Sequence, residues 1–292
     1  TQEVKEEIRT WQEGEDIYRE VTLKTPRGDL RMVERSNPRI NTVWVVEHFV
    51  KDLEDLEKVL SIPYEPYRPD TSSLTQAQEE IGDHGLLIAD VGDPLIYIFD
   101  LFDFSDFLVF ALTEEKRMHQ LLEMYFERIY NYLEYLLEAG AGPLVRIYGP
   151  EVATPPYLPN RLFKEYVVKY DKKLIDLIHQ YGCFCRVHAH GKVGTVLEDI
   201  VEMGADALDP VEAPPSGDIE LKEAKKRIGH QVTIFGNIQL HDLELRTEKE
   251  IVEITKKAID EGAPEGRFVL MPTAAPLEVD LKEQTKRNYM AM

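Results

Sequence analysis

The stretch CFCRVHAHGK (183–192) gathers side chains that can do chemistry. Because side chains alternate along a strand, Arg186, His188 and His190 share one face and the two cysteines share the other. Two imidazoles at the end of one strand are close enough to bind one cation, and neutral imidazole suits zinc, copper, iron or nickel. The alternative is that one histidine packs and hydrogen-bonds while the other binds substrate without a metal.

A catalytic zinc site needs a third protein ligand and an open position. The carboxylates available for this role are Glu151, Asp90 and Glu212. We choose Glu151, one unit earlier in the chain, and give it a catalytic role together with His188 and His190. The C-x-C pattern also suggests a metal site, but Cys183 and Cys185 share a face with the small apolar residues Val187 and Ala189, so we expect them to pack beneath helices.

A recurring junction indicates how these residues are positioned. Three helical patterns end in an acidic residue followed closely by Gly-Ala, at Gly140, Gly204 and Gly262, and glycine is the residue that most often terminates a helix. Strand-like segments alternate with such helices, which predicts parallel strands joined by crossover helices. Six of them follow residue 84: GLLIADVG (85–92), PLVRIYG (143–149), CFCRVHAHG (183–191), DALDPVE (206–212), QVTIFGN (231–237) and RFVLMP (267–272).

The helices between these strands are also readable. Amphipathic periodicity predicts helices over residues 114–139, 160–181 and 192–203. Thr247 and Glu250 form a capping-box signature at the start of a helix that runs through Ile259.

Residues 1–84 differ from the rest of the chain. VTLKTPRGDLRMVER (21–35) and NTVWVVEHF (41–49) predict a β-hairpin, and DLEDLEKVL (52–60) predicts a short helix. We therefore expect an α/β protein: a TIM (β/α)8 barrel over residues 85–292, short of its first strands, with residues 1–84 as an extension of the same domain. Either that region closes the barrel in an unusual way, or the first strands belong to sequence before Thr1; we favour the second.

In such a barrel the active site lies at the carboxyl ends of the strands. The expected substrate-binding residues are therefore those near strand ends: Asp90, Arg146, Tyr148, Arg186, Asp209 and Asn237. Arg146 could bind a substrate carboxylate or form a salt bridge at the barrel bottom. Asp209 and Glu212 could position substrate hydroxyls or be solvated loop acids, and Asn237 could be a turn residue or a hydrogen-bond donor to a ligand.

The composition excludes several classes of partner. Lys+Arg 34 against Asp+Glu 54 gives a net charge of −20, which argues against nucleic acid and anionic membranes. Two cysteines are too few for a disulfide scaffold, which indicates a reducing, cytoplasmic location. No apolar run reaches the roughly 18 residues that span a bilayer. A homodimer is compatible with the sequence.

Several ordered segments resemble the uroporphyrinogen decarboxylase superfamily. They are LPNRLFKEYVVKYDKKLID (158–176), CRVHAHGKVGTVLEDIVEMGADALDPVE (185–212), VTIFGNIQLHDL (232–243) and VLMPTAAPLEVDLKEQTKRNYMAM (269–292). TPRGDL (25–30) resembles its cobalamin-dependent methyltransferase branch. The resemblance implies a TIM barrel. It also implies either a porphyrinogen decarboxylase or an enzyme that exchanges methyl groups with a corrinoid.

The resemblance also implies a metal site, with two departures from the family's ligand pattern. In coenzyme M methyltransferases of this superfamily an H-x-C pair and a later cysteine bind zinc. Here His188 matches the first ligand, His190 replaces the cysteine, and MPTAAP (271–276) holds no cysteine. Because these cysteines are absent, the resemblance leaves a site with histidine and carboxylate ligands, whose metal would act as a Lewis acid on an ether or amine substrate.

The resemblance thus favours a methyltransferase that moves a methyl group between a small methylated substrate (a methyl ether, methylamine or thiol) and a corrinoid protein. The corrinoid would be supplied by that partner, and zinc would be held by His188, His190 and Glu151. The alternative is a decarboxylase-like lyase that acts on a tetrapyrrole carboxylate and uses Arg146 and Arg186. A third possibility is a barrel that binds a corrinoid or tetrapyrrole without turnover.

Overall fold

The computed structural model describes residues 4–292, apart from the side chain of Thr75. The chain divides into two compact units. The first comprises the described part of Thr1–Pro66 with Tyr97–Leu121 and Pro276–Leu281, and the second comprises Tyr67–Ile96, Leu122–Ala275 and Lys282–Met292.

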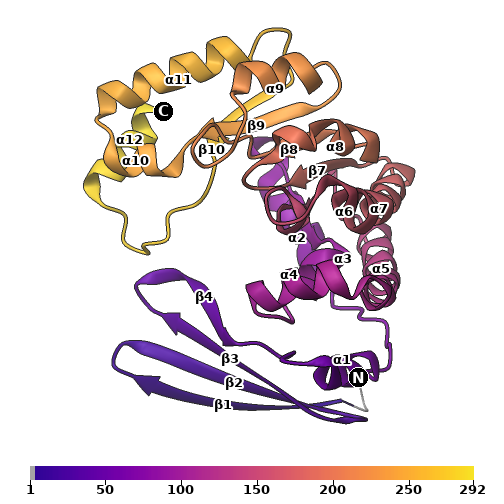
Figure 1. The fold of residues 1–292 in the computed structure, drawn as a ribbon. Helices are drawn as coiled ribbons and strands as arrows, with labels where there is room; N and C mark the ends of the chain where they lie inside the picture. Colours follow the sequence, from indigo (N-terminus) through magenta and orange to yellow (C-terminus); the bar gives the residue numbers. More distant parts are fainter. Residues whose placement is uncertain (1–3) are drawn as a thin grey trace. The chain divides into compact units, whose positions relative to one another are not determined.

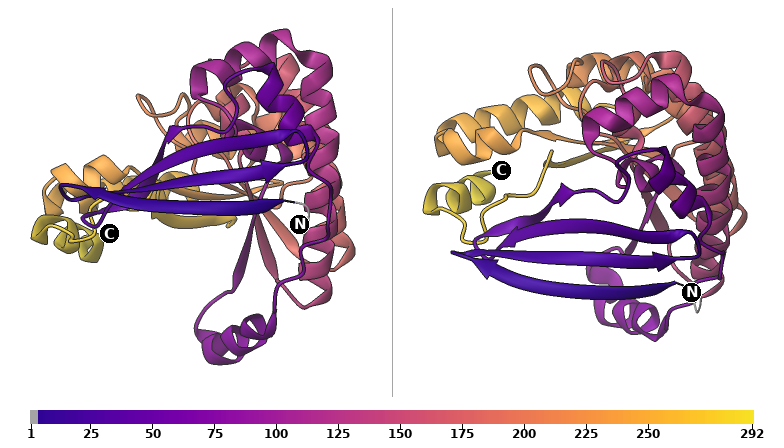
Figure 2. Two further views of the ribbon diagram at one scale, coloured as in Figure 1. Left: turned by 90° about the horizontal axis from the view of Figure 1, so that it is seen from below. Right: turned by 60° about the horizontal axis from the view of Figure 1, so that its bottom comes forward.

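The first unit is built on a four-stranded antiparallel sheet with the order β1-β2-β3-β4 (Figures 1 and 2). Its strands are β1 (Lys5–Glu13), β2 (Asp16–Thr25), β3 (Gly28–Asn37) and β4 (Ile40–Glu47). The predicted hairpin is present as β2–β3, joined by a tight turn at Pro26 and Arg27. The first strand was not predicted, because KEEIRTWQE is polar and mostly exposed.

A small core supports this sheet. The predicted short helix is α1 (Leu53–Leu60), capped by the Asp52 side chain, which accepts from the Asp55 N–H. Leu56 and Val59 of α1 and Leu30 of β3 are buried, and α1 contacts β3. The unit also contains α4 (Phe104–Thr113), whose Phe107 and Phe110 are buried.

The second unit holds a six-stranded parallel sheet with the order β10-β9-β8-β7-β6-β5. All six predicted strands are present: β5 (Ile88–Gly92), β6 (Leu144–Tyr148), β7 (Phe184–His188), β8 (Ala207–Asp209), β9 (Thr233–Ile238) and β10 (Phe268–Pro272). Sequential parallel strands joined by helices are the architecture of a (β/α) barrel, and the sheet has six such strands within residues 4–292. In the described residues, β5 and β10 are the two edges of this sheet.

The predicted helices are also present. They are α5 (Glu115–Glu138), which continues from the first unit, α7 (Lys169–Gln180), α8 (Leu197–Met203) and α11 (Glu248–Gly262). Thr247 and Glu250 form the predicted capping box. The segment before α7 departs from a regular helix, because α6 (Asn160–Phe163) passes into a π-helical turn over Lys164–Val168.

Shorter helices complete the chain, and sequence analysis did not single them out. They are α2 (Ser72–Ile81), α3 (Pro94–Phe99), α9 (Leu221–Ile228), α10 (Leu240–Leu245) and α12 (Glu283–Ala291). Figure 1 shows α9 and α11 along the same side of the sheet, and the two helices are in contact. Within residues 4–292, no helix has the length and apolar character needed to cross a membrane.

Candidate functional site

The alternation predicted for β7 sets the orientation of the site. Cys185, Val187 and Ala189 are fully buried, as expected for a face that helices cover. Both cysteines are free thiols, and Cys183 is half-buried. Arg186 and His188 therefore lie on the opposite, inner face, and residues two apart continue along that face to His190.

The strand register places further polar residues beside them. His188 lies opposite Tyr148 of β6 on one side and Asp209 of β8 on the other. One layer lower on the same face, Arg186 lies opposite Arg146 of β6, which in turn lies opposite Asp90 of β5. Parallel pairing thus places Tyr148, His188 and Asp209 in one row across the sheet, and Asp90, Arg146 and Arg186 in the next row. All of them except His188 were predicted as substrate-binding residues.

His188 and His190 are each held by a carboxylate. The Nδ1–H of His188 donates to Oδ2 of Asp209 at 2.8 Å, and the Nδ1–H of His190 donates to Oε2 of Glu212 at 3.3 Å. In the described part of the chain, neither Nε2 atom has a hydrogen-bond partner. Each ring therefore presents a nitrogen that is available to a ligand.

Glu212 has a second contact on the same loop. Its Oε2 also accepts from the Gly191 N–H at 2.8 Å. Burial raises the pKa of Glu212, but the hydrogen bonds from His190 and Gly191 outweigh burial, so its pKa lies below the ordinary value. Burial lowers the pKa of His190, but the Glu212 hydrogen bond and the charges of Glu212, Glu151 and Asp209 outweigh it and raise the pKa.

The arginines of the inner face are already paired. Arg146 forms a two-pronged contact with Asp90, at 2.8 and 2.5 Å. Arg186 is 7% exposed and its Nε lies 2.8 Å from Oδ1 of Asp209, an ion pair without hydrogen-bond alignment. Its guanidinium also lies 5.1 Å from the ring centroid of Phe235. Of the two roles foreseen for Arg146, this geometry fits the salt bridge.

Glu151 lies near the histidines but does not complete a ligand set with them. Its Oε2 accepts from the Gly149 N–H at 3.1 Å, and its charge acts on the pKa of His190. Among described residues, the ligand atoms of Glu151, His188 and His190 do not all lie within 4.8 Å of one another. Of the carboxylates considered from sequence, Glu212 is the one in contact with a site imidazole, that of His190.

Sequence analysis did not predict that two buried carboxyl groups lie near each other, with one of them close enough to Glu151 to feel its charge. Asp93, which follows β5, and Asp171 of α7 are both 0% exposed. Within the part of the chain that the structure describes, Oδ2 of Asp93 and both oxygens of Asp171 have no hydrogen-bond partner. Burial raises the pKa of both groups well above the ordinary value, and for Asp93 the charges of Asp171 and Glu151 add to this. The signal was an acid at position 171 on a stripe with Leu174, Ile175 and Ile178.

Asn237 and Gln239 lie at the carboxyl end of β9. Asn237 pairs in register with Met271 of β10. Gln239 is 9% exposed, and its buried Nε2 has no hydrogen-bond partner among residues 4–292. Alternation from Phe235 and Asn237 places Gln239 on the inner face, where a polar ligand could satisfy it.

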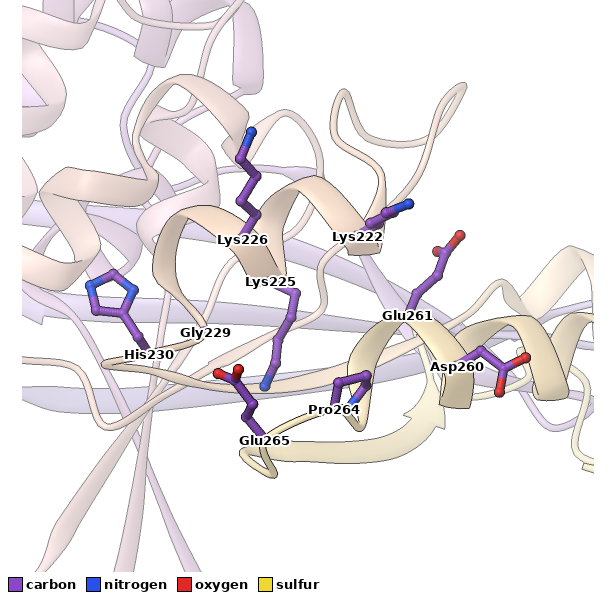
Figure 3. Close-up of a pocket in the computed structure, with 9 residues that line it drawn as sticks. All are labelled: Lys222, Lys225, Lys226, Gly229, His230, Asp260, Glu261, Pro264 and Glu265. Atoms are coloured by element: carbon purple, nitrogen blue, oxygen red, sulfur yellow. The ribbon is translucent and has the colours of Figure 1, made fainter.

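A separate groove of about 510 Å³ lies between α9 and α11 (Figure 3). Gly229 and His230 line it just before β9, and Pro264 and Glu265 line it before β10. It therefore lies at the amino ends of the strands, where barrel residues usually serve stability. Lys225 fits that role, because its Nζ donates to the carbonyls of Gly266 and Arg267 in the loop before β10.

Comparison with known proteins agrees with this architecture. The family model described as "Uroporphyrinogen decarboxylase (URO-D)" matches residues 28–279. The chain belongs to the URO-D family. The resemblance inferred from the ordered segments is therefore confirmed at the level of the family.

Relatives within the URO-D family are distant. "Uroporphyrinogen decarboxylase" from Prochlorococcus marinus is 24% identical over 241 residues, covering 79% of this chain and 64% of its own length. The protein of the same name from Actinobacillus pleuropneumoniae is 26% identical over 183 residues, covering 61% of this chain and 48% of its own length. The chain thus spans less than two thirds of the length of these relatives.

A solved structure extends the comparison to the fold. The "methyltransferase from Methanosarcina mazei" superposes with a TM-score of 0.64 at 20% sequence identity, covering 88% of this chain and 73% of its own. At that identity the similarity concerns the fold. Which reaction a URO-D family member of this kind performs must be argued from its site.

Proposed function

We propose that this URO-D family protein is a methyltransferase that moves a methyl group between a small methylated substrate and a corrinoid protein. The substrate would be a methyl ether, a methylamine or a methylated thiol. The observation that carries the proposal is the pair of imidazoles at the end of β7, each bound through Nδ1 to a carboxylate and each with an open Nε2. Carboxylate–histidine pairs are the usual surroundings of metal-binding histidines.

His188 and His190 offer two nitrogen donors of a kind that zinc binds, but a carboxylate would have to move toward them to complete the site, because the ligand atoms of Glu151, His188 and His190 do not all lie within 4.8 Å of one another among the described residues. His188 and His190 would hold zinc through their Nε2 atoms, and Glu151 would be the third ligand, as proposed from the sequence. Glu212 contacts Nδ1 of His190, so it would orient that ring from the side away from the metal. When bound, zinc would supply Lewis-acid polarisation of the oxygen, nitrogen or sulfur that carries the methyl group. The other roles in the reaction belong to side chains of the protein itself.

Removing a methyl group from oxygen or nitrogen requires that the leaving atom become less basic, because it gains an electron pair as the bond to carbon breaks. Glu151 is half-buried beside the imidazoles. In a reaction without the metal, Glu151 would instead supply a proton to the leaving atom. Asn237 and Tyr148 would orient the substrate from the neighbouring strands. The methyl group would pass to the cobalt of a corrinoid carried by a partner protein. That corrinoid protein would be the second substrate of the reaction.

The inner-face charges favour this reaction over the lyase. A porphyrinogen carries several carboxylates and would require free cationic groups, whereas Arg146 and Arg186 are each paired with an acid of their own. The lyase remains the second candidate, because the curated relatives bear the name "Uroporphyrinogen decarboxylase". The free thiols of Cys183 and Cys185 fit a reducing, cytoplasmic setting, and a homodimer fits either activity.

Metal analysis combined with two activity assays tests the proposal. Purified protein is expected to contain about one zinc per chain and to methylate cob(I)alamin from a methoxylated, methylamine or methylthiol donor. It is expected not to decarboxylate uroporphyrinogen. Decarboxylation without bound zinc would establish the lyase, and corrinoid or tetrapyrrole binding without turnover would establish a binding protein.

A further inference from the structure

We infer that Asp209 is a positioning residue: it holds His188 in the tautomer that directs the Nε2 lone pair out of the protein and into the site. This inference rests on the proposed function in one respect, namely the use made of that lone pair. The orientation itself follows from the contacts of Asp209.

Both oxygens of Asp209 are committed to protein partners. Oδ2 accepts from Nδ1 of His188 at 2.8 Å, and Oδ1 lies 2.8 Å from Nε of Arg186. The residue is 1% exposed. Asp209 therefore cannot contact substrate in this arrangement, although sequence analysis placed it among the substrate-binding residues.

The surroundings fix Asp209 from both sides. The β7–β8 register places His188 directly opposite Asp209, and the guanidinium of Arg186 lies against the ring of Phe235. Arg186 is buried with Asp209, so each compensates the charge of the other. A carboxylate held in this way accepts but cannot donate, so the nitrogen facing it must carry the proton. The proton on His188 is therefore at Nδ1 and the lone pair at Nε2.

Replacement of Asp209 by asparagine reverses this requirement. Arg186 can only donate, so it favours an asparagine whose amide oxygen faces the guanidinium. The amide NH2 would then face His188, and Nδ1 would have to accept. We therefore expect Asp209→Asn to shift His188 toward the tautomer protonated at Nε2, which cannot bind a cation through that atom.

Asp206 provides a matched control on the same strand segment. Its Oδ2 lies 2.8 Å from Nε2 of His179 and accepts from the Cys185 N–H at 2.7 Å. Asp206→Asn removes the same charge and the same kind of imidazole contact, but three residues away, roughly 10 Å along the strand. It should leave the His188 tautomer unchanged.

Nitrogen-15 NMR of histidine-labelled, metal-free protein reads the tautomers directly, at a pH where the rings are neutral and with His188→Gln for assignment. The expected result is Nδ1–H at His188 in the wild type and in Asp206→Asn, and a shift toward Nε2–H in Asp209→Asn. A wild-type His188 protonated at Nε2 would overturn the inference without any variant having to fold.

Zinc affinity gives the second readout, by competition with a chromophoric chelator. Asp209→Asn should bind zinc about 10–100-fold more weakly than wild type, and Asp206→Asn should bind as wild type does. Equal affinities for Asp209→Asn and wild type would contradict the inference. If wild type shows the Nδ1–H tautomer but binds no zinc, the positioning role stands and the metal in the proposed function fails.

Discussion

His188 and His190 meet edge to face, with their ring centroids 4.8 Å apart and their planes at 88°. Both rings come from the end of one strand, yet each is oriented by an acid that comes from, or just after, the next strand. The arrangement is thus a product of tertiary structure rather than of the local sequence. It gives two neighbouring nitrogens a fixed orientation before any ligand arrives.

Substitution of Asp171 should stabilise the protein at neutral pH. A buried carboxyl without partners stays protonated in the folded state, so folding must hold a proton that the unfolded chain has released. Asp171→Asn removes this cost, which at pH 7 is at most about 4 kcal/mol for a carboxyl with an ordinary pKa near 3.9. Urea unfolding measures the gain.

The stability of the protein should change with pH in a definite direction. Because burial raises the pKa of Asp171 in the folded state, wild-type stability should fall as pH rises from about 4 toward that raised pKa. Asp171→Asn should show a shallower fall, with the remainder due to Asp93. Asp176→Asn, on the same helix but half-exposed and paired with Lys172, should show the wild-type slope. An unchanged slope in Asp171→Asn would contradict this account.

Gly149 should not tolerate a side chain. Its φ is +125°, and a Cβ there would lie 2.4 Å from Oδ1 of Asp93 and 2.6 Å from Cβ of Ile96. Gly140 has φ +90° but open space around the same position. Both alanine variants place a non-glycine residue at positive φ, which costs stability in each. The additional clash should make Gly149→Ala lose about 1–3 kcal/mol more free energy of unfolding than Gly140→Ala. Equal losses of stability in thermal or urea unfolding would show that the backbone around Gly149 can shift to accommodate the added Cβ.

The cysteines should differ in reactivity. Burial raises the pKa of both thiols, and the pKa of Cys185, which is fully buried, lies well above its ordinary value. An aromatic disulfide reagent should therefore modify one thiol in native protein and two in denatured protein. Cys183→Ser should abolish the native reaction without lowering zinc content. Loss of zinc would make the C-x-C pair a metal site after all.

The pairing of Arg146 with Asp90 can be measured directly. Because the two side chains are 28% and 47% exposed, a double-mutant cycle with Arg146→Met and Asp90→Asn should give a coupling energy of about 0.2–1 kcal/mol, reduced by salt. Zero coupling at low salt would leave Arg146 free to bind a substrate carboxylate, as the lyase requires.

Much of the barrel unit could be predicted because its signals are local. Alternation along CFCRVHAHG separated buried Cys185 from inward Arg186, and the capping box at Thr247 marked a helix start. The π-helical turn over Lys164–Val168 has no such signal. Strand β1 was missed because its residues are polar on both faces and its order depends on pairing with β2.

The site was predicted as a set of residues but not as a set of contacts. Strand-end position and alternation suffice to select Arg186, His188 and Asp209. Which oxygen meets which nitrogen depends on the β7–β8 register, which no local pattern encodes. For the same reason Asp209 was taken for a substrate ligand, and the proximity of Asp171 to the site was not foreseen.

Methyl transfer to cob(I)alamin by wild type and by the His188→Ala/His190→Ala double variant tests the central claim most directly, with His179→Ala as a control that removes an imidazole from the other end of the strands. Wild type and His179→Ala should form methylcobalamin, and the double variant should remain folded but form none. A folded double variant that demethylates the donor at the wild-type rate would contradict the claim.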